Sequence, residues 1–434
     1  MKFLHERLDN GLDIIAEVTD AALSTSVGFF VKTGARDESD DLWGASHFLE
    51  HMIFKGTHDL SADEINRRFD WMGASANAFT SEEDTVYHAA VLPEQQVEAT
   101  SLLARMMRPA LRDEDFATEK LVILEEIRMY DDQPPFGADD RCRAAFFGSH
   151  PLARSVLGTV ESIEALSIEA MRDYHRRRYA PGTIVLAASG AVNFRELVES
   201  ARRFCGEWEP MESPPRRVPF EGRTLASRSS LEYITRPTAS LEYAVRLSSG
   251  PAGDHADRFA SKLLATILGD DSGSRLYWSL VDSGEAENAS CHHFDFLDAG
   301  LFGTQLSCDA QDVVELLARI QDIYRDAAGR TAQDRDGAGA GISAAELEQA
   351  RNKLAGRVVL GGERPQRRLF SIGVEWAHKG SYRSVSDDLQ IVESINLEDI
   401  RRVLDCWPLD GPSTTVLAGP YAAATSIESA ASAE

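Results

Sequence analysis

The pentapeptide His47-Phe48-Leu49-Glu50-His51 carries most of the chemical information in this chain of 434 residues. On a helix, the two histidines lie four positions apart and Glu50 lies three positions after His47, so the three side chains project from one face. Two imidazoles at this spacing can hold one zinc ion, and a neighbouring carboxylate can take a proton from water at that ion. The residue order is the inverse of the H-E-x-x-H motif of zinc hydrolases. The pentapeptide therefore predicts a helix that carries part of a zinc site.

The residues around the pentapeptide favour a helix. Leu49, Met52 and Ile53 form an apolar stripe at helical spacing, and Gly56 is a plausible end of the helix. The alternative interpretation is a buried helix whose two histidines make ordinary hydrogen bonds. The choice between them depends on the rest of the chain.

A zinc site for hydrolysis usually has three protein ligands, so a third ligand is expected elsewhere. The helix predicted over 113–131 carries Glu119 and Glu126 seven residues apart, on the face that also carries Val122 and Ile123. A carboxylate on the apolar side of a helix is costly unless it is paired or bound to a metal. Glu126 is therefore the expected ligand, and Glu119 is the expected acceptor that orients a histidine. An exposed acidic start of a helix is the alternative, and it fits Glu119 better than Glu126.

Composition limits the class of protein. The chain has 70 acidic and 45 basic residues and a formal charge of −25, which argues against a nucleic-acid partner. An acidic interior that attracts basic peptides and a solvated acidic surface would explain this charge equally well. The five scattered cysteines indicate neither a disulfide framework nor a thiolate metal site. We expect a cytoplasmic protein without a membrane span, because no apolar run is long enough and the start of the chain is too polar for a secretory signal.

Periodicity predicts alternating strands and helices, with helices packed against a mainly antiparallel sheet in each half, hence the α+β class. Ser61 and Glu64 suggest a capping box at the start of the second helix. In the first half we expect strands at 12–17, 24–32 and 183–190, an extended segment at 74–92, and helices at 62–72, 93–107, 113–131, 137–147, 166–178 and 193–205. In the second half we expect a strand at 239–248, strands within 289–308, and helices at 254–269, 274–283, 311–328 and 343–358.

The expected division of the chain is a catalytic zinc-binding domain at 1–208, a proline-containing linker at 209–225, a homologous inactive domain at 226–420 and a disordered tail at 421–434. The glycine-rich segment 331–342 follows a helix, so we expect a flexible loop there and no nucleotide site. An internal duplication is plausible but weak in the sequence, because the second half has no second H-x-x-E-H motif.

These motifs resemble the pitrilysin/insulinase family of zinc metallopeptidases, in the short two-domain branch that includes mitochondrial processing peptidase. In that family a ligand glutamate follows the inverted motif by about 75 residues, in a helix similar to Val122–Ile127 here. The resemblance implies His47, His51 and Glu126 as ligands of one Zn²⁺ per chain, with Glu125 as the nearest rival ligand. It also implies Glu50 as general base and Glu119 as a supporting acid. The segment Leu8–Leu12 resembles the opening strand of the family, and Gly73–Thr80 resembles the strand beside the metal.

The resemblance further implies two similar halves that form a clamshell-like chamber. A peptide would bind there as an extended strand added to a sheet edge, for which the candidate residues are Asn77, Ala78 and Phe79. The implied activity is that of a zinc-dependent endopeptidase acting on peptides or unfolded segments. The implied partners are peptide substrates and a second subunit, in a homodimer or a heterodimer with a related chain.

One departure from the family favours a different function. The family commonly carries an Arg and a Tyr in its second half that bind substrate, and Val281 and Asn288 stand at the aligned positions here. A non-catalytic or weakly active subunit that binds peptides or a partner enzyme is therefore the alternative, and a zinc hydrolase of non-peptide amides is a third possibility. The nearby run Cys291, His292, His293 and Asp295 could suggest a second metal site, but the alternation of a strand explains it better.

Overall fold

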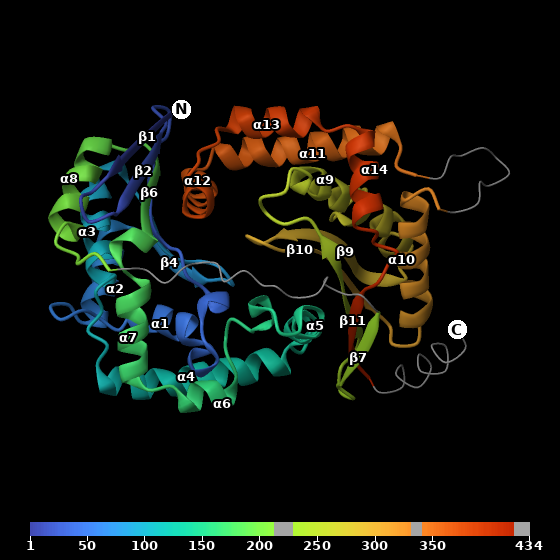
Figure 1. Ribbon diagram of the computed structural model, residues 1–434, viewed down its shortest axis with the longest axis horizontal. Helices are drawn as coiled ribbons and strands as arrows, with labels where there is room; N and C mark the ends of the chain where they lie inside the picture. Colours follow the sequence, from blue (N-terminus) through green and yellow to red (C-terminus); the bar gives the residue numbers. More distant parts are fainter. Residues whose placement is uncertain (212–228, 331–340, 421–434) are drawn as a thin grey trace. The chain divides into compact units, whose positions relative to one another are not determined.

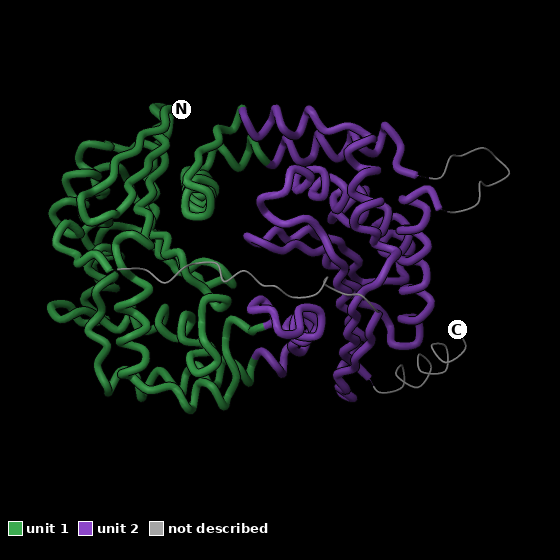
Figure 2. Tube along the Cα trace, in the orientation of Figure 1, with its two compact units in different colours: residues 1–129, 154–220, 358–386 green, residues 130–153, 221–357, 387–434 purple. Residues whose placement is uncertain are grey.

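The computed structural model describes residues 1–211, 229–330 and 341–420 (Figure 1). The chain divides into two compact units (Figure 2). Each unit contains one sheet and its own apolar core. Unit 1 comprises residues 1–129, 154–220 and 358–386, and unit 2 comprises residues 130–153, 221–357 and 387–434. Among the helices of the described residues, none combines the length and apolar character that a membrane crossing needs.

The sheet of unit 1 has six strands. In spatial order they are β1 (Lys2–Arg7), β2 (Asp13–Val18), β6 (Ile184–Gly190), β3 (Thr25–Val31), β5 (Thr85–Val91) and β4 (Ser75–Thr80). Only β2 and β6 pair in parallel, and the other neighbours are antiparallel. The central strands β3 and β6 are buried along their whole length, which explains their continuous apolar character. Strand β4 forms one edge of this sheet.

Helices of the first half of the sequence surround the larger apolar core of unit 1. They are α1 (Ala45–Ile53), α2 (Ala62–Met72), α3 (Gln96–Met106), α4 (Asp113–Asp132), α6 (Val160–Ala165), α7 (Ile168–Arg178) and α8 (Phe194–Cys205). Their buried side chains interlock with those of the sheet, as in other α+β proteins. Helices α1 and α4 pass next to this core and carry the predicted metal ligands.

The sheet of unit 2 has five strands. In spatial order they are β7 (Ser230–Thr235), β11 (Thr414–Gly419), β8 (Glu242–Gly250), β10 (Gly300–Cys308) and β9 (Ala286–Asp295). Again one pair, β7 with β11, is parallel, and the other neighbours are antiparallel. The helices of this part of the chain are α9 (Arg258–Gly269), the short π-helix η6 (Tyr277–Val281), α10 (Val313–Ala327), α11 (Ala344–Gly362), α13 (Val385–Ser394) and α14 (Leu397–Cys406).

Each unit also takes one helix from the other half of the sequence. Helix α5 (Ala138–Phe147) packs on β8 and β11 of unit 2, whereas α12 (Pro365–Lys379) packs on β3 and β6 of unit 1. The reason is that both sheets have a second apolar face that must be covered. The compact units therefore differ from the predicted domains at 1–208 and 226–420 in these two segments.

The predicted α+β class, with two sheets packed by helices, is confirmed. The extended segment expected at 74–92 is confirmed as the two strands of a hairpin, β4 and β5, joined by a turn at the polar residues 81–84. Two local expectations are wrong. Residues 8–12 form the turn between β1 and β2, closed by a hydrogen bond from the N–H of Leu8 to the carbonyl of Leu12. Ser61 caps α2 as expected, but Glu64 pairs with Arg68, so the capping box is incomplete.

Several elements have no counterpart in the sequence-based expectations. They are β1, β7, β11, α6, α12, α13 and α14. The predicted tail and most of the predicted linker and of the loop 331–342 lie outside the described residues.

Candidate metal centre

Helix α1 begins at a turn that requires glycine. Gly44 has a φ of +90°, and a Cβ atom there would lie 2.7 Å from the Cδ1 of Ile163. The carboxylate of Glu38 accepts hydrogen bonds from the backbone N–H groups of Gly44 at 2.7 Å and Ser46 at 2.6 Å. Burial raises the pKa of Glu38 to about 7. These contacts hold the first turn of the helix from which His47 projects.

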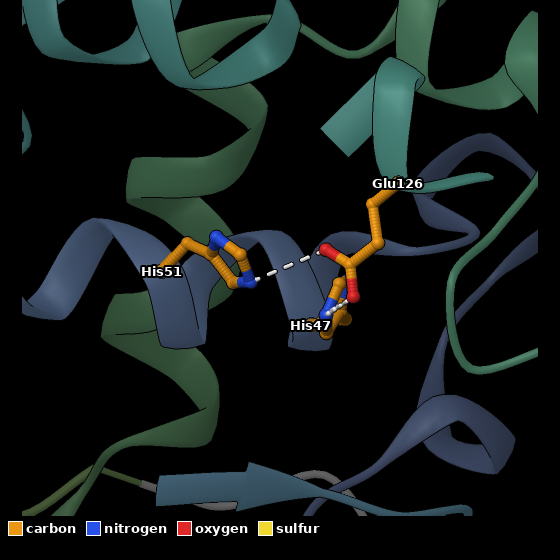
Figure 3. A group of neighbouring side chains, drawn as sticks. All are labelled: His47, His51 and Glu126. Atoms are coloured by element: carbon orange, nitrogen blue, oxygen red, sulfur yellow. Dashed lines mark ion pairs between the residues drawn. The ribbon is translucent and has the colours of Figure 1, made fainter. Parts of the chain in front are cut away.

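Helix α4 brings a carboxylate to the two histidines of α1. One ligand atom each of His47, His51 and Glu126 lies within 4.8 Å of the other two. The Nε2 atom of His47 is 3.7 Å from Oε1 of Glu126, and the Nε2 atom of His51 is 3.6 Å from Oε2 (Figure 3). The structure therefore brings together the three residues that the sequence predicts as ligands.

The donor set fits a zinc ion. Imidazole nitrogens and a carboxylate are its usual ligands in hydrolytic sites. Burial, and secondarily the neighbouring His51, lower the pKa of His47 to about 4, so this imidazole is neutral at pH 7 and has a lone pair to donate. Glu119 Oε1 lies 2.9 Å from Nδ1 of His51, where it can accept the N–H and leave the lone pair of Nε2 facing Glu126.

Glu119 lies where a supporting acid is expected. It is 4% exposed and contacts His51, whereas the alternative of an exposed helix start would leave it in solvent. Glu125, the rival ligand, is exposed and forms an ion pair with Arg128 on the same helix. Among the described residues, the cluster of possible metal ligands includes Glu126 and not Glu125.

Glu50 lies on α1 between the two histidines. Its Oε2 accepts a hydrogen bond of 2.7 Å from the hydroxyl of Thr80, the last residue of β4. Burial raises the pKa of Glu50 above its ordinary value, while Thr80 and His51 oppose this shift and Glu126 adds to it. A carboxylate with a raised pKa is a better proton acceptor than an ordinary carboxylate, and Glu50 lies beside the metal-binding cluster.

The residues predicted to bind substrate lie on the edge strand β4. Asn77 and Phe79 are exposed and Ala78 is half-buried. The backbone N–H of Ala78 donates to the side chain of Asn77 at 2.9 Å. The ring of Phe79 packs edge-on against Phe370 of α12, with 5.6 Å between centroids.

Three residues near the cluster have roles that the sequence analysis missed. Glu38 supports the start of α1, Thr80 binds Glu50, and Lys55 contacts Glu119. Glu38 lies in a segment without a recognisable pattern, so no sequence signal would have found it. Thr80 ends the segment Gly73–Thr80, whose resemblance to the strand beside the metal was the available signal. The contact of Lys55 with Glu119 joins two segments far apart in the chain, so no local pattern pointed to it.

The described residues of the second half contain no comparable cluster. On β9, Cys291 and His293 are buried while His292 is exposed, so the strand alternates as expected. Nε2 of His293 contacts the carbonyl of Pro251 at 3.0 Å, and the described residues hold no metal-binding group here. Val281 ends the π-helix η6, and Asn288 is an exposed residue of β9.

The chain matches two family descriptions. "Insulinase (Peptidase family M16)" matches residues 13–160, and "Peptidase M16 inactive domain" matches residues 165–354. A zinc protease of Streptomyces coelicolor, described as uncharacterized, is 32% identical over 401 residues, which cover 91% of this chain and 85% of that protein. The zinc protease YmxG of Bacillus subtilis, likewise described as uncharacterized, is 29% identical over 394 residues, with 90% and 92% coverage.

A solved structure has the same fold. A protease from Helicobacter pylori superposes with a TM-score of 0.87 at 21% sequence identity, covering 96% of this chain and 100% of that one. At this identity the likeness concerns the fold alone.

Proposed function

This chain belongs to the insulinase family of peptidases, peptidase family M16, and we propose that it is a zinc-dependent endopeptidase. The observation that carries the proposal is the approach of His47, His51 and Glu126 to within 4.8 Å, with Glu50 on the same helix turn. The names of the relatives, which are called zinc proteases, support the same reaction and the same metal. One zinc ion per chain would be held by these three side chains.

The proposed chemistry is the hydrolysis of a peptide bond. When bound, zinc supplies a Lewis acid that lowers the pKa of water and polarises a carbonyl group. Glu50 takes a proton from the attacking water and passes it to the leaving amine. Because Thr80 holds one carboxylate oxygen of Glu50 at 2.7 Å, the other oxygen is the one that exchanges the proton. Glu119 holds His51 in the orientation that directs Nε2 toward the cluster.

The proposed substrate is a peptide or an unfolded segment in an extended conformation. It would pair with β4, the edge strand whose end carries Thr80 next to Glu50. The N–H of Ala78 donates to the side chain of Asn77, an exposed residue, so a substrate could compete for this N–H once Asn77 moves aside. Backbone pairing reads the extended shape of a peptide more than its sequence, so varied substrates are expected.

Replacement of Glu50 by Gln tests the proposal. This variant should bind zinc as the wild type does and lose about 10²- to 10⁴-fold in the turnover of quenched fluorescent peptides, because the proton acceptor is removed. Glu125→Gln is the matched control, since it makes the same change on an exposed site near the cluster. Turnover by Glu50→Gln at the wild-type rate would refute the assignment of the base.

The second candidate function is a non-catalytic subunit that binds peptides or a partner peptidase. Val281 and Asn288, at the positions of the Arg and Tyr of the family, favour it, because neither side chain can supply the charge or the phenol. Zinc bound by the wild type without cleavage of any peptide in a broad panel would support this candidate. The mass of the native protein in solution would show whether it works as a homodimer or needs a related second chain.

A further inference from the structure

Lys55 lies just beyond α1 in a backbone segment that is held from several sides. Its N–H donates to the carbonyl of Met52 at 3.1 Å, and the guanidinium of Arg112 donates to the carbonyl of Thr57 at 2.6 Å. Between them, Gly56 has a φ of +113°, and a Cβ atom there would lie 2.5 Å from the carbonyl oxygen of a neighbouring residue. The position of Lys55 relative to the helix is therefore well defined.

The ammonium group of Lys55 contacts the carboxylate that supports the metal centre. Its Nζ lies 2.5 Å from Oε2 of Glu119, while Oε1 of Glu119 lies 2.9 Å from Nδ1 of His51. Oε1 of this buried carboxylate thus has a hydrogen-bond partner, and Oε2 is paired with a cation, without the geometry of a hydrogen bond. A carboxylate buried without a compensating positive charge is strongly unfavourable, and Lys55 supplies that charge.

The total charge around the metal centre also indicates that Lys55 compensates a carboxylate. Glu50, Glu119 and Glu126 place three carboxylates around the two imidazoles. Together they carry one more negative charge than a divalent cation balances, and Lys55 provides the remaining positive charge.

The two histidines differ in how their second nitrogen is held. Nδ1 of His51 contacts Glu119, which in turn contacts Lys55. Nδ1 of His47 is buried and has no hydrogen-bond partner among the described residues. The row of contacts from Lys55 through Glu119 therefore orients His51 alone, while His47 is oriented by packing.

We propose that Lys55 is a positioning residue of the metal centre, which holds Glu119 so that His51 presents Nε2 to zinc. This inference rests on the proposed zinc site, and nothing in the proposed reaction requires Lys55 to touch the substrate. Its replacement should weaken zinc binding through Glu119, and the loss should depend on Glu119 being present.

Zinc affinity of the full chain, measured by competition with a chromogenic chelator, is the direct test. Lys55→Met should weaken zinc binding about 10- to 100-fold, the range found for outer partners of metal ligands. Lys55→Arg should restore most of the affinity, because it keeps the charge. Arg68→Met is the matched control, since it removes ion pairs with Glu64 and Glu98 that involve neither the ligands nor Glu119, and it should bind zinc normally.

A double-mutant cycle separates positioning from a general effect on folding. In the Glu119→Gln background, Lys55→Met should change zinc affinity less than about twofold, because the two residues act in series. The melting temperature of the zinc-free protein should change little with Lys55→Arg, and the visible spectrum of the cobalt-loaded form should shift with Lys55→Met and return with Lys55→Arg. Should Lys55→Met lower the yield of folded protein, Lys55→Gln replaces it in the same cycle.

The failure of this inference differs from the failure of the proposed function. Normal zinc affinity in Lys55→Met, together with loss of zinc in His51→Ala, would overturn the role of Lys55 and leave the metal centre intact. Equal losses from Lys55→Met with and without Glu119 would also overturn it, because the effect would not pass through Glu119. A wild-type protein that binds no zinc would overturn the proposed function and this inference with it.

Discussion

The two sheets of this protein share a topology but differ in chemistry. In unit 1 the order β2-β6-β3-β5-β4 begins with a parallel pair and continues antiparallel, and β7-β11-β8-β10-β9 of unit 2 does the same. The first sheet adds β1 at its edge. This shared topology supports an internal duplication that the sequence indicated only weakly.

The helices follow the same order in the two units, and they show where the chemistry differs. By chain order α9 of unit 2 stands where α1 stands in unit 1, and α11 stands where α4 does. Helix α9 has neither histidine nor glutamate, and α11 uses Glu346 to bind Arg275 at 2.7 Å. The scaffold alone therefore does not bring two histidines and a glutamate together, and a few side chains on two helices decide which unit carries the proposed metal site.

The exchanged helices show a second difference. Helix α5 covers the sheet of unit 2 with apolar side chains such as Phe146, and the thiol of Cys142 donates to two backbone carbonyls. Helix α12 covers the sheet of unit 1 and adds a buried ion pair in which Arg368 contacts both oxygens of Glu17, at 2.8 and 2.5 Å. Helix α5 also pairs Arg141 with Glu232 of β7, but that ion pair is exposed, whereas the ion pair of α12 is buried.

Loss of that charge should have the largest effect on stability. Arg368→Met should lower the free energy of unfolding by about 3–5 kcal/mol, because it leaves the carboxylate of Glu17 buried without its cation. Urea denaturation followed by circular dichroism measures the free energy of unfolding. Arg367→Met, at the exposed neighbouring residue, should change the free energy of unfolding little. The double variant Arg368→Met/Glu17→Leu should recover part of the stability that Arg368→Met loses. Equal stability of the Arg368 and Arg367 variants would contradict this account.

The difference between α4 and α11 can be tested at the metal. Glu126→Gln should weaken zinc binding by at least about 100-fold, because a ligand is removed rather than an outer partner. Glu346→Gln on α11 and Glu125→Gln on α4 should bind zinc as the wild type does. Competition with a chelator measures the zinc affinity of all three variants. If Glu125→Gln lost more zinc affinity than Glu126→Gln, Glu125 and not Glu126 would be the ligand.

Glu38 in unit 1 and Glu242 in unit 2 are buried carboxyl groups, and burial raises the pKa of each to about 7. The two groups differ in their hydrogen-bond partners. Glu38 in unit 1 accepts two backbone N–H bonds, whereas Oε2 of Glu242 in unit 2 has no partner among the described residues. Because the folded pKa lies above the ordinary value of 4.5, the stabilising contribution of each group is present below about pH 4.5 and is lost as the pH rises through about 7.

Glu242→Gln and Glu38→Gln should therefore change the stability of the protein in different ways. At pH 8 Glu242→Gln should be more stable than the wild type by about 1–3 kcal/mol, because a buried unpaired carboxylate is removed, and at pH 5 the two should be nearly equal. Glu38→Gln should be less stable than the wild type at both pH values, because one backbone N–H loses its acceptor. Thermal melts at pH 5 and pH 8 measure the stability of both variants relative to the wild type. A destabilised Glu242→Gln at pH 8 would contradict the prediction.

The smallest effect is expected at the end of β4. Thr80→Val removes the hydrogen bond to Glu50, and such a bond contributes about 0.5–1.5 kcal/mol. We expect a decrease in kcat of about two- to tenfold with KM unchanged, because the backbone that pairs with substrate is retained. Thr118→Val, on an exposed site of α4, is the control. An increase in KM at constant kcat would mean that Thr80 contacts substrate rather than Glu50.

Local patterns predicted much of this protein. The apolar stripe around the pentapeptide, the Ser61 cap and the long acidic helix over 113–131 all lie where periodicity placed them. The candidate site followed from spacing, because four and seven residues on helices bring side chains to one face. The turn at 81–84 was missed because the polar residues there lie between two strands that read as one extended segment.

The sequence by itself predicted the class of the fold and the faces of α1 and α4 that carry histidine and carboxylate side chains, because both depend on helical and strand periods that act over a few residues. That these two faces meet was expected from the family resemblance, and the tertiary structure brings them together. Only the tertiary structure decided which sheet each of α5 and α12 covers, and that Thr80 and Lys55 contact Glu50 and Glu119. These contacts join residues that are far apart in the chain or lie on different elements. They arise because apolar faces must be covered and buried carboxylates must be paired, and neither requirement leaves a local pattern.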